Sequence, residues 1–411
     1  MSEKVKPGYK QTEVGVIPKE WEVKRLGEIA TIATGNTPPT WDAANYGDEF
    51  LFVGPVDLGE AKRITSTEKR LSKKGFAISR RFPKNSILFV CIGSTIGKCG
   101  IASVELTSNQ QINSIFPSPD FSVDYLYYSV CTAVPKIRAL AGEQAVPIVN
   151  KTQFLETMVA IPPLPEQRVI ADALSDVDAL IDALDQLIAK KRNIKQAGMQ
   201  QLLTGQKRLP GFHGKWEVKH LGDVGMFSKG SGIKKDEVVA DGLPCVRYGE
   251  IYTHHNDYLK AFNSFITPAT AEQSQRIEKG DLLFAGSGET AEEIGKCIAF
   301  LGNQEAYAGG DIVIFRPVGQ DSMFLGYLMN QSSVASQKAR MGQGDAVVHI
   351  SARNLAQLKL HLPSQSEQTA IADVLSDMDA ELEALEARRD KTRALKLGMM
   401  QELLTGRTRL V

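Results

Sequence analysis

One long segment, rich in charged residues and leucine, occurs twice in the chain. The first copy begins at Glu166 and reads EQRVIADALSDVDALIDALDQLIAKKRNIKQAGMQQLLTGQKRL. The second begins at Glu367 and reads EQTAIADVLSDMDAELEALEARRDKTRALKLGMMQELLTGRTRL. The copies lie 201 residues apart and align without a gap. Because this period is about half of the chain, it predicts one internal duplication and excludes a solenoid of short repeats.

Similarities outside this segment extend the duplication to each half of the chain. WEVKRLGEIA at Trp21 returns as WEVKHLGDVG at Trp216. IVNKTQFLETMVAIPPLPEQ from Ile148 is echoed by HISARNLAQLKLHLPSQSEQ from His349. The halves agree in the long segment and at their starts, and they differ in most of the interior. Two halves that share these segments but differ in their interior sequence predict two units with the same role and different targets.

The repeated segment has the spacing of an α-helix with one apolar stripe. Apolar residues step by four and three, as in a coiled-coil seam. Pro165 suits the first turn of a helix, Ser366 can cap the second copy, and Gly205 and Gly406 mark the two ends. About 38 residues predict a helix on the order of 57 Å long. The predicted seam residues are Ile170, Leu174, Val177, Ile181, Leu184 and Ile188, and Ile371, Leu375, Met378, Leu382 and Leu385.

A helix of this length with a narrow apolar stripe needs a partner, and the other copy is the obvious candidate. If the second helix packs beside the first and runs back, the pair is antiparallel and pseudo-two-fold. Ile181 and Leu184 would then pack against the stripe that holds Leu382 and Leu385. The alternative is that each helix packs on its own globular unit.

The remaining segments are typical of a mixed α/β structure with short strands. Strand-like apolar runs begin at Glu49, Asn85, Gly242 and Asp311, and helices are predicted at 123–140 and 321–340. These segments show no clean βαβ alternation, so we do not predict a doubly wound sheet. The predicted class is α+β, with two pseudo-symmetric mixed α/β domains joined by two long helices in an antiparallel coiled coil. The expected boundaries are 1–162 for the first domain, 163–206 for the first helix, 207–363 for the second domain and 364–411 for the second helix.

Composition limits the classes of partner and compartment. The 48 basic and 48 acidic residues cancel, so a surface that attracts nucleic acid would have to be local. The five cysteines form no CxxC pair, which argues against a thiolate zinc site or a disulfide framework. The first residues have no apolar core of a signal peptide, and no apolar run approaches a membrane span. We expect a cytoplasmic chain.

No enzyme motif is complete in this sequence. GSTIGKC at Gly93 has three residues between its glycines where a phosphate loop has four, and Cys99 replaces the Ser or Thr that would hold magnesium. FAGSGET at Phe284 has the shape of a glycine-rich cofactor loop, which alone is weak evidence. There is no HExxH metal motif and no GxSxG elbow. This pattern favours a binding protein, with no catalytic residue and no metal ligand, over an enzyme.

Candidate DNA-binding residues fall into two groups. A basic strip between Leu58 and Lys84 would neutralise phosphates, although a solvated charged loop explains it equally well. Polar residues crowd the glycine-rich turns, where they could contact base edges or only stabilise the turns. The candidates are Asn36, Thr37, Lys69, Arg70, Lys73, Lys74, Ser94, Thr95, Lys98, Gln110 and Gln111 in the first half, and Ser231, Lys234, Lys235, Arg247, Ser287, Glu289 and Thr290 in the second.

The first long segment, with the preceding IPPLP, resembles the central shared region of type I restriction–modification specificity subunits. The second copy resembles the distal shared region of that family. GNTPPTWDAANYGDEFLFVGPVDL and GSGIKKDEVVADGLPCVRYGEI look like the opening blocks of two different target recognition domains. The resemblance covers nearly the whole chain, and the helical match is its most specific part.

This resemblance implies a non-catalytic DNA-recognition subunit. Each target recognition domain would read one half of a bipartite site in double-stranded DNA. The paired helices would set the unread gap and dock two modification subunits, which methylate adenine at N6, and restriction subunits would join them. S-adenosylmethionine, ATP and magnesium would then belong to partner subunits, with no cofactor in this chain. The alternatives are a stand-alone DNA methyltransferase, with its cofactor loop at Phe284, and a protein scaffold.

Overall fold

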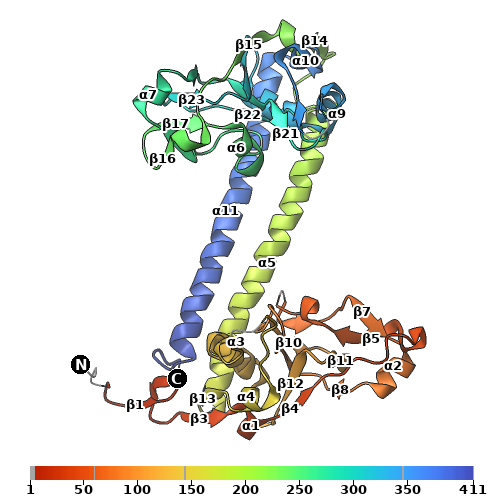
Figure 1. Cartoon of the computed structure of the whole chain (residues 1–411), viewed down its shortest axis with the longest axis vertical. Helices are drawn as coiled ribbons and strands as arrows, with labels where there is room; N and C mark the ends of the chain where they lie inside the picture. Colours follow the sequence, from red (N-terminus) through yellow and green to blue (C-terminus); the bar gives the residue numbers. More distant parts are fainter. Residues whose placement is uncertain (1–4, 60, 143–144, 345–346, 411) are drawn as a thin grey trace. The chain divides into compact units, whose positions relative to one another are not determined.

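The computed structural model describes residues 5–59, 61–142, 145–344 and 347–410. The chain forms two units: unit 1 contains residues 1–185 and 387–411, and unit 2 contains residues 186–386. Two long helices, α5 (Leu164–Leu202) and α11 (Gln365–Leu403), each contribute to both units (Figure 1). Unit 1 is therefore assembled from two separate parts of the sequence, whereas unit 2 is continuous.

The globular domain of unit 1 contains short strands and, in its described residues, the α-helices α1 to α4 besides the long ones. Its elements are β1 (Tyr9–Thr12), β2 (Gly15–Pro18), β3 (Glu22–Arg25), α1 (Leu26–Ile29), β4 (Ala30–Thr34), β5 (Tyr46–Val53), β6 (Arg63–Ile64), β7 (Lys69–Leu71), α2 (Lys73–Ile78), β8 (Arg81–Phe82), β9 (Ile87–Val90), β10 (Cys99–Ala102), β11 (Leu106–Ser108), β12 (Ile112–Pro117), α3 (Val123–Ala139), α4 (Lys151–Leu155) and β13 (Met158–Ile161). The strands form a five-stranded sheet in the order β4-β12-β9-β10-β6 and a four-stranded sheet in the order β7-β5-β11-β8. Most neighbours are antiparallel, while β6–β10 and β5–β11 are parallel.

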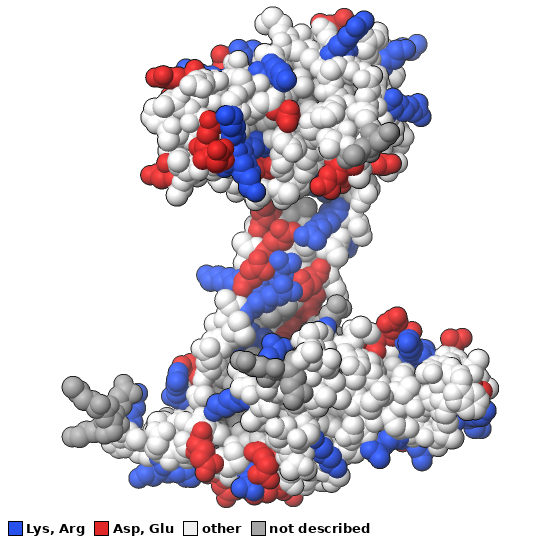
Figure 2. Space-filling view, viewed as in Figure 1, with Lys and Arg blue, Asp and Glu red and all other residues white. Residues whose placement is uncertain are grey.

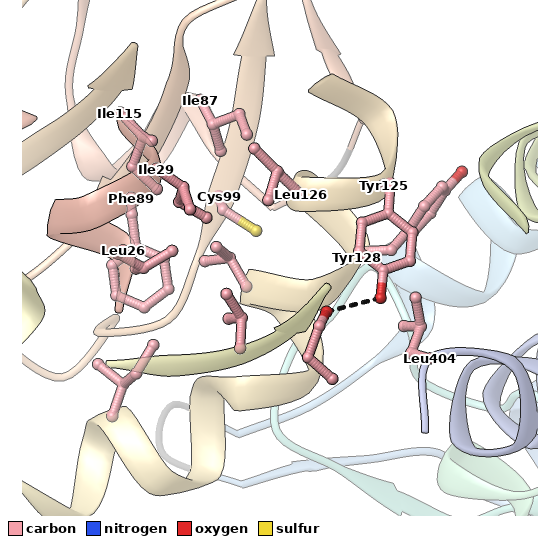
Figure 3. Packing of buried hydrophobic residues seen from close by; sticks show 14 of the residues in the cluster. Leu26, Ile29, Ile87, Phe89, Cys99, Ile115, Tyr125, Leu126, Tyr128 and Leu404 are labelled. Carbon is pink, nitrogen blue, oxygen red and sulfur yellow. Dashed lines mark hydrogen bonds between the residues drawn. The ribbon is translucent and has the colours of Figure 1, made fainter. Parts of the chain in front are cut away.

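A single apolar cluster joins this domain to both long helices. Figure 3 shows Phe89 of the five-stranded sheet and Leu126 of α3 within it, with Leu404 from the end of α11 nearby. Ile170 and Leu174 of α5 belong to the same cluster and are fully buried. The start of α5 and the end of α11 therefore both pack on the globular core of unit 1.

Unit 2 repeats this plan. Its elements are β14 (Glu217–His220), β15 (Gly225–Lys229), β16 (Val238–Val239), β17 (Leu243–Val246), α6 (Tyr248–Thr253), β18 (Ser264–Ile266), α7 (Pro268–Ala271), β19 (Gln275–Ile277), β20 (Leu282–Ala285), β21 (Ser287–Gly288), β22 (Cys297–Ala299), β23 (Ala306–Ala308), β24 (Ile312–Pro317), α8 (Ser322–Asn330), α9 (Ser332–Met341), β25 (Val348–His349), α10 (Ala352–Ala356) and β26 (Lys359–Leu362). The sheets have the orders β15-β24-β20-β22 and β16-β18-β17-β23-β19. Leu202 and Leu203 from the end of α5, with Ile371 and Leu375 of α11, complete its core.

The short elements follow the predictions with two differences. Strands lie at Tyr46–Val53, Ile87–Val90 and Ile312–Pro317, as expected, but the run from Gly242 turns into helix α6 after β17. The helix expected over 321–340 is broken into α8 and α9. The break occurs because Gln331 has an extended backbone, and its side chain caps α9 by accepting a hydrogen bond from the Ser333 amide.

The two long helices each contain 39 residues. Gly205 and Gly406 follow their last turns with φ of 69° and 68°, the left-handed conformation in which glycine ends a helix, so both stop signals are confirmed. The expected cap at Ser366 is wrong: this residue lies inside α11, and the hydroxyl of Ser364 accepts from the Glu367 amide instead. Among the described residues, none of the helices combines the length and the apolar character that a membrane crossing requires.

Ion pairs show the direction of the helix segments within each unit. In unit 1, Asp178 of α5 pairs with Lys396 of α11 at 2.6 Å, and Asp185 pairs with Arg393 at 2.8 Å. As the number rises along α5, the number of its partner falls, so the two segments are antiparallel. Unit 2 shows the same direction, since Lys191 pairs with Glu381 and Lys195 with Asp379, both at 2.6 Å.

This register shows which parts of the seam lie at the same level. Ile181 lies one turn before Asp185 in unit 1, at the level of residues near Arg393, and Leu382 follows Glu381, which lies beside Lys191 in unit 2. Ile181 therefore lies at the level of a part of the α11 stripe other than Leu382, to which the prediction assigned no position along the stripe. Burial follows the predicted stripe. Ile170, Leu174, Ile181, Leu184, Ile188, Ile371, Leu375 and Leu382 are buried, and Val177, Met378 and Leu385 are half-buried.

A matched set of tyrosine, aspartate and lysine fastens the helices to each domain. In unit 1, the hydroxyl of Tyr128 donates to Asp178 at 2.6 Å, and the ammonium of Lys396 lies 5.5 Å from the tyrosine ring centre. In unit 2, Tyr327 donates to Asp379 at 2.6 Å, and Lys195 lies 5.4 Å from its ring centre. Burial, followed by the hydrogen bond to aspartate, raises the pKa of both tyrosines, so both remain protonated donors.

A second matched set secures the helix ends. Glu166, only 1% exposed, accepts hydrogen bonds from the Trp21 indole at 3.0 Å and from two nitrogens of Arg409 at 2.9 Å. In unit 2, the equivalent Glu367 is bound by Arg208, whose guanidinium lies 5.7 Å from the Trp216 ring. A buried carboxylate is tolerated only when it is paired in this way.

We expect Glu166→Gln to destabilise unit 1 by about 2 kcal/mol, because the variant loses a buried charge-assisted pair while it keeps the shape of the side chain. Urea unfolding of the full chain measures this change. Glu402→Gln is the control, since Glu402 pairs with Arg407 on the surface, and we expect a change below about 0.5 kcal/mol. Equal effects of the two substitutions would contradict the role of Glu166.

Candidate nucleic-acid interface

Three loops at one edge of the five-stranded sheet bring polar residues of unit 1 together. The loop after β4 carries Asn36 and Thr37, and the loop between β11 and β12 carries Gln110 and Gln111. The hydroxyl of Thr37 donates to the side-chain oxygen of Gln110 at 2.6 Å. Since Thr37 and Gln110 are both exposed, this predicted pair lies at the surface where a ligand can reach it.

The third loop connects β9 to β10 and carries three further candidates. Ser94 is exposed, while Thr95 and Lys98 are half-buried. The loop lies beside the second one, because the amide of Cys91 donates to the carbonyl of Gln111 at 2.8 Å. These contacts bring the turn residues of unit 1 to one edge of the sheet.

The sequence reasoning missed Arg80 as a member of this edge. Its backbone amide donates to the side chain of Asn36 at 2.6 Å, and its guanidinium donates to the carbonyl of Thr34. Arg80 belonged to the basic strip but was not selected, because nothing in its spacing links it to Asn36. Only the fold brings these residues together.

The basic strip divides into free and paired residues. Lys69 and Arg70 lie on β7 and are exposed, and Arg70 donates to the backbone of Glu49. Lys73 and Lys74 are exposed on α2, but Lys74 pairs with Asp42 at 2.7 Å, and this hydrogen bond lowers the pKa of Asp42. On the face seen in Figure 2, by contrast, basic and acidic side chains are interspersed along both long helices. Lys69 and Lys73 are therefore the better candidates for phosphate contacts.

The candidates of unit 2 occupy similar loops but differ in accessibility. Ser231 is exposed and donates to the Gln273 carbonyl at 3.1 Å, and Arg247 is half-buried with its Nε 3.5 Å from Glu250. Lys234, Lys235, Glu289 and Thr290 are exposed. Ser287 is only 4% exposed, and its hydroxyl is bonded to Nδ1 of His349 at 3.0 Å. Ser287 can therefore contact a ligand only through its neighbours.

Matched backbone hydrogen bonds relate the loops of the two units. Gly35 donates to Ile112 at 3.0 Å, as Gly230 does to Ile312 at 2.9 Å. The Cys91 amide donates to the Gln111 carbonyl, and the Gly286 amide donates in the same way to the Asp311 carbonyl, both at 2.8 Å. The Val149 amide donates to Cys91 at 2.9 Å, and its equivalent Ile350 donates to Gly286 at 3.0 Å. The duplicated frame thus holds corresponding loops in the same way, while the side chains differ.

The geometry offers little support for the enzyme alternative. A dinucleotide-type glycine loop leads from a strand into a helix, but the segment from Phe284 leads into β21, which pairs with β25. Among the residues that the structure describes, no group of three or more His, Cys, Asp or Glu side chains could hold a metal ion. What the loops offer is an array of hydrogen-bond donors and acceptors with nearby lysines, which suits binding to nucleic acid.

Comparison with known proteins agrees with this arrangement. The family model described as the type I restriction modification DNA specificity domain matches twice, over residues 18–192 and 213–392. The MjaVIII specificity subunit of Methanocaldococcus jannaschii is 24% identical over 426 residues, which cover 96% of this chain and 94% of that protein. The MjaIX specificity subunit of the same organism is 28% identical over 264 residues, 58% of this chain and 60% of that protein.

Solved structures share the fold. The S subunit of a type I restriction–modification system from M. genitalium superposes with a TM-score of 0.61 at 14% identity, covering 93% of this chain and 96% of that one. A chain from a study of complex assembly in the type I system gives a TM-score of 0.58 at 16% identity, covering 95% and 99%. These matches confirm the expected α+β class with two domains and long helices. Because the family model covers most of both halves, the chain belongs to the type I restriction–modification DNA specificity family.

Proposed function

We propose that this chain is the DNA sequence-specificity subunit of a type I restriction–modification complex, in which each unit reads one half of a bipartite site. The observation that carries this proposal is that both units hold corresponding polar loops at one edge of a sheet. Matched backbone bonds hold the same loops in both units, yet unit 1 presents Asn36, Thr37 and Gln110 where unit 2 presents other side chains. Two copies of one frame with different polar groups suit two unlike half-sites.

The long helices are the segments through which the chain passes from one unit to the other. The unit boundaries fall after Asp185 in α5 and after Glu386 in α11. A helix of 39 residues spans about 58 Å. We propose that this fixed length sets the number of unread base pairs between the half-sites.

Exposed apolar residues on the long helices support docking of modification subunits. In unit 1, Leu395 is 59% exposed beside a cavity of about 560 Å³ lined by Ala173, Gly398 and Leu403. In unit 2, Ile194 is 45% exposed, and it occupies the position of α5 that corresponds to Leu395 in the other copy. Such apolar surface on a charged helix favours a protein partner. One docking surface for each unit suits two modification subunits, and restriction subunits would complete the complex.

We place the chemistry in those partners. Modification subunits would bind S-adenosylmethionine and methylate adenine at N6, and restriction subunits would use ATP and magnesium. This chain would be non-catalytic. The enzyme alternative is distinguished by calorimetry, since a stand-alone methyltransferase would bind S-adenosylmethionine when purified alone.

The decisive test is single-molecule sequencing of DNA from cells that express this chain with a modification subunit from the same system. We expect N6-methyladenine in an asymmetric bipartite motif with a fixed gap. A single contiguous motif would mean that one unit alone reads DNA. Absence of methylation in a complex shown to be folded and loaded with S-adenosylmethionine would favour the scaffold alternative.

The basic strip predicts a salt effect. We expect the double substitution Lys69→Ala and Lys73→Ala to weaken DNA binding and to lower the slope of log affinity against log salt by about 2, one for each phosphate that the variant no longer neutralises. Fluorescence anisotropy with a duplex that carries the motif measures this slope. Lys219→Ala is the control, since Lys219 pairs with Glu217 on β14. An unchanged slope in the double variant would remove the strip from the interface.

The docking surface predicts a defect in assembly. We expect Leu395→Asp to reduce copurification of the modification subunit at least about tenfold, because a charge would replace an apolar contact in the interface. Analytical size-exclusion chromatography of the reconstituted complex measures this. Val218→Asp changes an equally exposed apolar residue on β14 and serves as the control. Normal assembly of the Leu395 variant would place the docking surface elsewhere.

A further inference from the structure

Unit 2 contains a cavity of about 500 Å³ at its polar edge. The cavity lies among β15, the start of β21, the start of β24 and the segment from His349 into α10. Phe227, Ile312 and Ile350 contribute apolar surface, while Lys229, Asp311 and His349 contribute polar groups that are exposed to solvent. An apolar site with a few exposed polar groups is typical of ligand recognition.

The duplicated frame shows how this place differs between the two units. At the equivalent place in unit 1, Thr34 donates to Asn113 at 2.7 Å, and Asn113 donates to the sulfur of Cys91 at 3.1 Å. Cys91 and Asn113 are each 3% exposed, and burial raises the pKa of the Cys91 thiol to about 12, so this filled site is uncharged. Backbone pairing shows that unit 2 has Lys229, Val313 and Gly286 at these three positions. Gly286 contributes no side chain to the lining of the cavity, in contrast to Cys91 in unit 1.

A second difference lies in the wall of the cavity. In unit 1, Ile92 and Ile148 face each other in an antiparallel bridge. The equivalent bridge in unit 2 joins Ser287 to His349, and the serine hydroxyl is bonded to Nδ1 of the imidazole at 3.0 Å. This bond fixes the ring and leaves Nε2 for a ligand. The apolar isoleucine pair of unit 1 is thus replaced in unit 2 by a polar serine–histidine pair that can contact a ligand.

Lys229 and Asp311 supply complementary chemistry in the lining of the cavity. Lys229 lies opposite Val313 in the β15–β24 ladder, and Asp311 stands in the turn directly before β24. Neither forms an ion pair with any residue in the described part of the chain. A lysine suits O6 and N7 of guanine in the major groove, and an aspartate accepts from N4 of cytosine.

We propose that this cavity reads the half-site of unit 2, with Lys229 and Asp311 recognising one G·C base pair and His349 contacting the adjacent base. The proposal rests on the function proposed above and adds the base pair and the residues that select it. Unit 1 cannot read its half-site in this way, because it has Thr34, Gln111 and Ile148 at the positions of Lys229, Asp311 and His349.

Methylome sequencing of cells that express the complete complex tests the proposal. We expect the second half-site to contain an essential G·C pair, and Lys229→Ala to reduce discrimination at that pair about 5- to 150-fold while the first half-site stays unchanged. His349→Ile, which copies Ile148 of unit 1, should relax the neighbouring position. Lys279→Ala, which changes an exposed lysine in the turn before β20 and outside the cavity, is the matched control and should leave the motif unchanged.

A second measurement changes the DNA and tests the wild-type complex first. The wild-type complex is titrated with duplexes in which the guanine of this pair is replaced by 7-deazaguanine, which lacks the N7 acceptor. We expect weaker binding by the wild type and no further loss in the Lys229→Ala complex. A second half-site without an essential G·C pair, or unaltered wild-type binding, would overturn the cavity assignment while a bipartite motif still supports the proposed function. Loss of the bipartite motif in the wild type would instead overturn the proposed function itself.

Discussion

The pairing of Glu166 with Arg409 determines how unit 1 is assembled. These residues are 243 positions apart, and the carboxylate is buried beneath the Trp21 indole. A buried charge without a partner is costly, so the end of α11 has to return to the start of α5. Glu367 and Arg208 impose the same condition on unit 2. The antiparallel direction of the helix segments is a consequence of these two fixed ends.

The tyrosine–aspartate–lysine sets then connect each domain to its helix segments at a second point. Asp178 receives Tyr128 from the domain and Lys396 from α11, and Asp379 receives the equivalent groups in unit 2. Polar contacts have stricter geometry than apolar ones. They therefore fix the frame, while the loops at the sheet edge are free to differ. This division explains how the two copies can preserve their architecture and diverge in the residues that meet DNA.

The sequence indicated the long helices correctly because their signals are local. Apolar spacing and the glycines at 205 and 406 act within a few residues. The register of the helix pair could not be obtained in this way, since the apolar stripe of α11 indicates which face packs but not which of its residues lies opposite Ile181. The ion pairs between the helix segments, such as those of Asp185 and Lys191, define that register.

The candidate site shows the same limit. Thr37 and Gln110 were selected from turn composition and lie in contact, whereas Ser287 proved to be buried against His349. His349, Lys229 and Asp311 were missed because each is ordinary in its own segment. A comparison of the copies could have identified His349, since Ile148 begins the matching segment of the first half. The cavity itself is lined by residues from several separate segments, which no local pattern reveals.

The division of unit 1 between residues 1–185 and 387–411 also has a consequence for synthesis. At about 5 to 20 residues per second, the roughly 200 residues between these segments take about 10 to 40 s to emerge from the ribosome. During that interval Glu166 has no arginine partner, and the apolar face around Ile170 lacks Leu403 and Leu404. The continuous unit 2 can close first. A chain terminated before Arg409 keeps an open core in unit 1, which exposes it to proteolysis. The core of the first domain can thus be completed only after translation has passed the last turn of α11.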